Sequence, residues 1–160
     1  MYPCAMAPTS FPYPSTDAHR FAREGATADA ASVARLRDEF ARWLRRASSM
    51  DEDRLCDTVL AVNEALANAA EFAYLDGRAG ILDFDAVLDH ARRLVTVTVT
   101  DHGRWREANP PNRLRFRGRG IPLMRALADS LVIETSGLGT RVRLGFHDGG
   151  VAGRVLNVGV

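Results

Sequence analysis

The sequence of 160 residues contains no lysine and no glutamine, and all 21 of its basic residues are arginine. The absence of lysine excludes a P-loop, a pyridoxal phosphate Schiff base and a kinase site of the eukaryotic type, because each of these depends on a lysine. Any phosphate group must therefore be bound by arginine, by backbone N–H groups or through a metal ion.

Cysteine and histidine are also scarce, and they form no recognisable metal site. Cys4 and Cys56 lie far apart and make no CxxC pair, and none of the four histidines has HExxH spacing. We therefore expect two free thiols in a reducing compartment and no structural metal site.

Bulk charge and hydropathy argue against a membrane-spanning or secreted protein and against attraction to nucleic acid through overall charge. The formal net charge of +1 gives no overall attraction to nucleic acid or to a membrane surface. No apolar run approaches the roughly 20 residues of a membrane helix, and the N-terminus lacks the basic and apolar regions of a signal peptide. We expect a cytoplasmic protein.

The composition is that of one globular domain, with 46% hydrophobic and 26% charged residues. Residues 1–17 contain four of the seven prolines, so we expect a flexible, proline-rich arm over residues 1–19. Residues 20–147 are predicted to form the domain. The glycine-rich residues 148–160 are predicted to be a mobile tail.

Hydrophobic periodicity predicts helices at about residues 29–47, 51–74 and 121–128, and strands at 80–88, 93–100, 131–134 and 140–146. Valine and threonine alternate strictly along 95–100. Residues 20–23 are the only candidate for a strand before the first helix. This order predicts an α+β fold, a two-layer sandwich with helices on one face of a mainly antiparallel sheet.

A polar stripe is predicted on the second helix, where Glu64, Asn68 and Glu71 fall within a narrow arc. No basic residue occurs between Leu55 and Tyr74. A solvated helix face usually carries basic side chains that pair with its carboxylates, so the stripe favours binding of a divalent cation or acceptance of a proton. An ordinary solvated face is the alternative.

Two glycine-bearing segments follow. Asp101 and Gly103 come directly after a strand, where they can bring a ligand close to the backbone or simply form a turn. Gly118 and Gly120 open the third helix, whose N–H groups favour an anion. They end a stretch with six arginines at residues 104–119, for which a solvated loop or a nucleic-acid contact is the alternative.

Four ordered segments resemble the GHKL (Bergerat-fold) ATPase and kinase domain, and more closely the anti-sigma-factor serine kinases of bacterial partner-switching systems. Residues 63–74 (NEALANAAEFAY) are similar to the N box, and residues 101–103 (DHG) to the G1 box. Residues 117–127 (RGRGIPLMRAL) look like the G2 segment, and residues 139–144 (GTRVRL) like the closing strand. The resemblance extends from about residue 28 to residue 146.

The resemblance implies a role for each matching residue. Glu64 matches the general base that activates a protein serine, and Asn68 matches the ligand of Mg²⁺ bound with ATP. Asp101 matches the acceptor for the adenine amino group, with Gly103 allowing close approach and Thr140 nearby. The G2 segment is expected to wrap the phosphates through its glycines and their neighbours, which are Arg117, Gly118, Arg119, Gly120 and Ile121.

The same resemblance implies an anti-sigma factor that phosphorylates an anti-anti-sigma antagonist, binds a sigma factor and can form a homodimer. Trp105 replaces the second glycine of the G1 box, and Phe72 occupies a position often held by histidine. A nucleotide-binding module that regulates its partner by binding alone is the alternative. The catalytic domain of a histidine kinase is disfavoured, because no phospho-accepting helix is present and the lid is short.

Overall fold

A computed structural model of the protein describes residues 18–73, 80–103 and 119–149. Within these residues, five strands form one antiparallel sheet in the order β1-β2-β3-β5-β4. The strands are β1 (Ala18–Thr27), β2 (Ile81–Asp89), β3 (Leu94–Asp101), β4 (Ser130–Ser136) and β5 (Gly139–His147). β4 and β5, which confirm the strands predicted at 131–134 and 140–146, pair with each other in antiparallel fashion.

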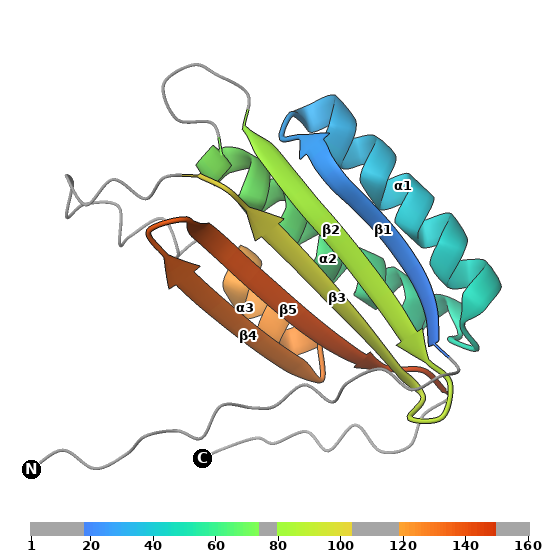
Figure 1. Cartoon of the computed structure of the whole chain (residues 1–160). Coiled ribbons are helices and arrows are strands. Elements are labelled where there is room, and N and C mark those ends of the chain that lie inside the picture. The colour runs from blue at the N-terminus through green and yellow to red at the C-terminus, as the bar shows by residue number, and fades with distance from the viewer. Residues whose placement is uncertain (1–17, 74–79, 104–118, 150–160) are drawn as a thin grey trace, which may run out of the picture.

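Three helices in the described residues cover one face of this sheet (Figure 1). They are α1 (Ala30–Ala47), α2 (Glu52–Ala73) and α3 (Gly120–Leu127). This confirms the predicted α+β fold, a two-layer sandwich with all helices on one side of the sheet. None of the described helices is long and apolar enough to span a membrane.

The core lies between the helices and the inward face of the sheet. Val95, Val97 and Val99 of β3 are buried, while the threonines between them lie on the other face and are half-buried. α1 contributes an apolar stripe that includes Phe40. Its start is fixed by Asp29, whose carboxylate accepts a hydrogen bond from the Ser32 backbone N–H at 2.8 Å.

β1 is longer than the four residues that the sequence indicated. It spans Ala18–Thr27 and pairs with β2, with a register shift between Arg23 and Ala26. Phe21 packs against Trp43 and Phe84, with ring centroids 6.0 and 5.8 Å away. The pairing and this aromatic contact stabilise a strand whose own pattern of alternation is weak.

The described elements and contacts reach slightly beyond both predicted boundaries of the domain. Ala18 and His19 lie in β1 rather than in the predicted arm. Asp148 was predicted to begin the tail, but it is buried and accepts a hydrogen bond from Ser49 N–H at 2.7 Å. Its own N–H donates to Arg93 O at 2.7 Å. The rest of the predicted arm and tail lies outside the described residues.

Arg54 of α2 holds the C-terminal end of α3. Its guanidinium donates to Leu127 O at 2.9 Å and forms an ion pair with Asp129. Asp129 also accepts a hydrogen bond from His147 N–H at 2.7 Å, which ties the same point to β5. With this end fixed, the short α3 directs its N-terminus toward the middle of α2.

Candidate functional site

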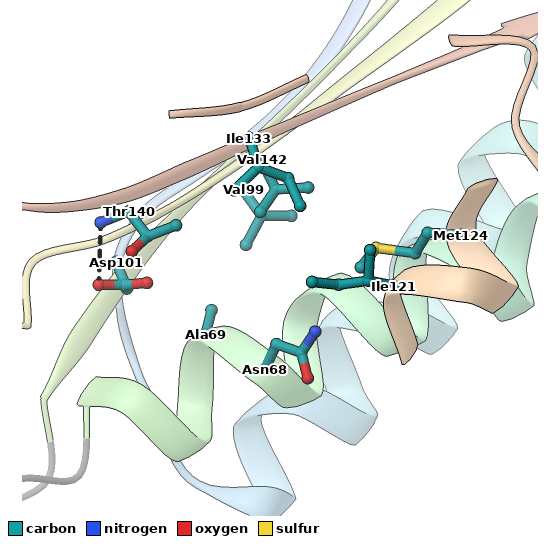
Figure 2. Close-up of a pocket in the computed structure, with 9 residues that line it drawn as sticks. All are labelled: Asn68, Ala69, Val99, Asp101, Ile121, Met124, Ile133, Thr140 and Val142. Carbon is teal, nitrogen blue, oxygen red and sulfur yellow. Dashed lines mark hydrogen bonds between the residues drawn. The ribbon is translucent and has the colours of Figure 1, made fainter. Parts of the chain in front are cut away.

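A small open pocket lies between the end of the sheet, α2 and α3, and the empty space in and in front of it, open solvent included, is about 310 Å³. Its walls are mostly apolar, and its polar residues sit at the ends. Figure 2 shows Asp101 and Thr140 on the sheet side and Asn68 on α2 beside the start of α3. The lining residues are Asn68, Ala69, Val99, Asp101, Ile121, Met124, Ile133, Thr140 and Val142. This combination suits a flat, largely apolar ligand with few polar groups.

Asp101 places a carboxylate at one end of this pocket. It is the last residue of β3 and only 4% exposed. Its Oδ1 accepts hydrogen bonds from Gly103 N–H and Thr140 N–H, both at 3.2 Å. Burial raises the pKa of Asp101 above its ordinary value, although the two N–H groups and His102 counteract this. No described residue donates to Oδ2, so this oxygen is available to a ligand.

Gly139 allows β5 to begin directly against Asp101. Its φ of 141° lies in the region that favours glycine, and a Cβ there would lie 1.9 Å from Asp101 O. The close approach brings Thr140 into register with Asp101. Gly139 begins the segment that resembles the closing strand, but nothing in the sequence indicates this close contact.

We expect Gly139→Ala to destabilise the fold by about 2–3 kcal/mol, because the new Cβ meets backbone in a strained conformation. Gly25→Ala is the matched control. Gly25 also has positive φ, at 64°, but nothing lies within 4 Å of the added Cβ, so its cost should be about 1 kcal/mol. Urea unfolding of the two variants measures the difference. Equal free energies of unfolding would contradict the prediction.

At the other end of the pocket, the polar stripe of α2 meets the start of α3. Glu64 and Asn68 lie one turn apart on α2, and the buried Gly120 packs against both. A Cβ on Gly120 would lie 3.1 Å from Glu64 Oε2 and 3.3 Å from Asn68 Nδ2. The glycine thus lets the first backbone N–H groups of α3 approach a carboxylate and an amide.

This end of the pocket can accept a metal only with help from a ligand. No group of three or more metal-binding histidine, cysteine, aspartate or glutamate side chains occurs in the described residues. Mg²⁺, however, is usually bound by one or two protein oxygens while phosphates and water complete its octahedron. The Asn68 amide oxygen beside the Glu64 carboxylate fits that mode of binding.

The structure brings together most of the residues that the sequence singled out. Asn68, Asp101, Ile121 and Thr140 line the pocket. Others border the lining residues: the Gly103 N–H donates to Asp101, and Glu64 and Gly120 lie beside Asn68.

Other predicted residues do not line the pocket. Arg119 is the exposed N-cap of α3, and its side chain makes no capping hydrogen bond. Arg117, Gly118 and Trp105 lie outside the described residues. Glu71 is exposed at the far end of the stripe.

Sequence reasoning missed the apolar walls of the pocket. Val99, Met124, Ile133 and Val142 line it, yet each also fits an ordinary core pattern. Alternation predicts that Val99 and Val142 face inward, but it does not predict where the helices leave that inward face uncovered. The only indication in the sequence is that Val99 lies two residues before Asp101 and that Val142 lies two residues after Thr140.

His102 is a second residue whose position the sequence did not explain. Its Nε2 lies 2.6 Å from Asp83 Oδ2 on β2. Asp83 also accepts a hydrogen bond from Gly25 N–H at 2.7 Å, and these contacts lower its pKa against the opposing effect of burial. The chain that leaves β3 after Asp101 is therefore attached to the neighbouring strand.

Comparisons with known proteins agree with this geometry. No curated protein matches the chain at a significant level. Among solved structures, it is similar to the RsbU and RsbW domains of Rv1364c from Mycobacterium tuberculosis, with a TM-score of 0.61 and 21% identity. That alignment covers 83% of this chain but 33% of the other, so the chain spans about a third of its length, and the likeness shows the fold alone.

The family comparison covers the whole of the pocket. The profile of the histidine kinase-like ATPase domain matches residues 26–146. This range is most of the chain, and it contains every residue that lines the pocket. The protein therefore belongs to the family of histidine kinase-like ATPase domains.

Proposed function

We propose that the protein binds ATP with Mg²⁺ and phosphorylates a serine on an anti-anti-sigma antagonist, and that it also sequesters a sigma factor in the cytoplasm. The observation that carries this proposal is the meeting of Glu64 and Asn68 with the start of α3, beside a pocket that ends in a buried carboxylate. Support also comes from the family membership and from the similarity to a structure that contains an RsbW domain.

The sheet end of the pocket is proposed to hold adenine. The apolar walls enclose the faces of a planar base, and the free Oδ2 of Asp101 accepts a hydrogen bond from the adenine amino group. Both backbone donors already reach Oδ1, so the orientation of the carboxylate is fixed before the ligand arrives. Thr140 and Gly103 keep that orientation and border the base.

The α3 end of the pocket is proposed to hold the triphosphate. The first N–H groups of a helix have no partners within the helix and carry partial positive charge. Arg119, Gly120 and Ile121 present these groups beside Asn68, whose amide oxygen would hold Mg²⁺. A bound Mg²⁺ neutralises charge on phosphate oxygens. We assign Arg117 and Gly118 to the same phosphate-binding segment.

Glu64 is proposed as the general base. It lies one helical turn from Asn68, and its Oε2 is at the start of α3. A carboxylate there can accept the proton of a serine hydroxyl as the serine oxygen bonds to the terminal phosphorus of ATP and the bond from that phosphorus to ADP breaks, so that ADP leaves. A nucleotide-binding module that regulates its partner without phosphoryl transfer would need Asn68 and Asp101 but not Glu64. Substitution of Glu64 therefore distinguishes a kinase from such a module.

Calorimetry with ATP tests the nucleotide site. We expect binding that depends on Mg²⁺, and we expect Asn68→Ala to weaken it about tenfold or more, because a ligand oxygen is lost. Asn63→Ala is the matched control: it makes the same change on the same helix, at a residue that does not line the pocket. Absence of ATP binding at millimolar Mg²⁺ would overturn the proposed function.

A further inference from the structure

A small network of polar contacts lies behind Asp101, on the face of the sheet opposite the helices. Asp83 belongs to this face, because its two neighbours in β2 are buried in the core. Its Oδ2 lies 2.6 Å from His102 Nε2, and its Oδ1 accepts a hydrogen bond from Gly25 N–H at 2.7 Å. The network therefore joins β1, β2 and the residue that follows Asp101.

His102 is the donor in its contact with Asp83. Burial alone would raise the pKa of Asp83, but the hydrogen bonds from Gly25 and His102, together with the charge of His102, lower it below its ordinary value. The carboxyl group is therefore ionised at neutral pH. Because an ionised carboxylate only accepts hydrogen bonds, Nε2 of His102 carries the proton that they share, and the bond is charge-assisted.

The second donor to Asp83 comes from an irregularity in β1. The register between β1 and β2 shifts between Arg23 and Ala26, and Gly25 lies within this shift with a φ of 64°. A bulge of this kind turns a backbone group out of the regular ladder, and here the Gly25 N–H reaches Asp83 Oδ1. With Oδ1 held by β1, the carboxylate presents Oδ2 to His102.

The network holds one side of the turn that orients Asp101. From β5, the Thr140 N–H donates to Asp101 Oδ1 at 3.2 Å. From β2, Asp83 holds His102, which is the residue between Asp101 and Gly103. The Gly103 N–H reaches Asp101 Oδ1, also at 3.2 Å, only while the backbone at His102 keeps its turn. The Asp101 carboxylate is therefore fixed from both neighbouring strands.

From this geometry we infer that His102 is a positioning residue of the nucleotide site, which acts through Asp83 to orient the Asp101 carboxylate. The inference rests on the proposed function, because it assigns to His102 a share of the affinity for ATP and of the preference for adenine over guanine. The imidazole itself touches no ligand, since its contact with Asp83 lies on the far face of the sheet. His102 thus sets the direction of Asp101 Oδ2 from outside the pocket.

The exposure of the pair separates this role from a role in folding. The side chains of His102 and Asp83 are 45% and 36% exposed, and an ion pair at such a surface position contributes little to the free energy of unfolding. The orientation of Asp101, in contrast, decides whether a buried hydrogen bond to the base can form. Loss of the pair should therefore change nucleotide affinity more than stability.

Calorimetry of the full-length protein with ATP and with GTP, each with Mg²⁺, tests this inference. We expect His102→Ala to weaken ATP binding about 3–10-fold, because a hydrogen bond to the base loses its alignment. GTP affinity should change less, so the preference for ATP narrows. His102→Gln should restore both, since the glutamine amide nitrogen takes the place of Nε2 and donates. His102→Asn should not, because its shorter amide takes the place of Nδ1.

A double-mutant cycle shows whether His102 acts through Asp83. Asp83→Ala should weaken ATP binding by a similar factor, and the double variant should bind no more weakly than either single variant. Asp85→Ala is the matched control. Asp85 is 35% exposed, lies on the same face of the same strand and forms an ion pair with Arg20, which does not contact Asp101. Its ATP affinity should equal that of the wild type, and thermal unfolding of every variant checks the fold.

The outcomes distinguish this inference from the proposed function. If the wild type binds ATP and His102→Ala keeps the same affinity and preference, or if glutamine rescues no better than asparagine, His102 has no positioning role, while the nucleotide site stands. If the wild type binds no nucleotide, both fail. Amide exchange of Gly103, measured by NMR before nucleotide is added, should be faster in His102→Ala but not in His102→Gln. Unchanged exchange in His102→Ala would also overturn the inference.

Discussion

A Glu64→Gln variant is expected to bind ATP with wild-type affinity and to phosphorylate an antagonist serine about 10²–10⁴-fold more slowly. Glutamine keeps the shape of the side chain and its ability to hydrogen-bond, but it cannot accept the serine proton. The packing of Glu64 Oε2 near Gly120 should survive the change. Calorimetry measures the affinity, and transfer of labelled phosphate measures the rate.

Glu71→Gln provides the matched control for this experiment. It makes the same change two turns further along α2, at an exposed residue that does not line the pocket. Its transfer rate should equal that of the wild type. If Glu64→Gln labels the antagonist at the wild-type rate, Glu64 is not the base. If the wild-type protein labels no antagonist, regulation by binding alone becomes the better explanation.

The elements of the fold could be predicted because their periodicity is strong. The alternation of valine and threonine in β3 requires one face to be buried, and the structure buries the three valines. The long apolar stripe of α1 likewise predicts its buried side. The sequence indicates only residues 20–23 of β1, because the strand is stabilised by pairing with β2 and by the packing of Phe21 against Phe84. Both interactions depend on partners that are distant in the sequence.

The site could be predicted only in part, for a related reason. Glu64 and Asn68 stand out because an uncompensated acidic stripe is unusual on a helix. The apolar walls do not stand out, because Val99 and Val142 look like any buried strand residue. The contact of Gly139 with Asp101 O depends on how β5 starts beside β3. Such contacts between distant segments have no signature within either segment.

Preference for adenine over guanine should depend on the Asp101 carboxylate. A carboxylate only accepts hydrogen bonds, so its free Oδ2 pairs with the adenine amino group but is opposed by the carbonyl oxygen that guanine carries there. A buried acceptor left without a donor costs about 1–3 kcal/mol, and more when it is charged. GTP should therefore compete with bound ATP at least about tenfold more weakly. Equal competition by the two nucleotides would contradict this role of Asp101.

Asp101→Asn should reverse that preference, because its backbone contacts dictate how the new amide is oriented. Gly103 N–H and Thr140 N–H both donate to Oδ1, so the asparagine oxygen must take that position and its NH₂ group must replace Oδ2. The NH₂ group opposes the adenine amino group but can donate to the guanine carbonyl. We expect ATP affinity to fall about 10–100-fold while GTP affinity rises relative to it.

Asp148→Asn is the matched control. Asp148 is equally buried, at 4% exposed, and it also accepts a hydrogen bond from a backbone N–H, but it lies outside the pocket. Nucleotide competition measured by calorimetry decides the matter: if both Asn variants keep the wild-type preference, adenine is recognised elsewhere.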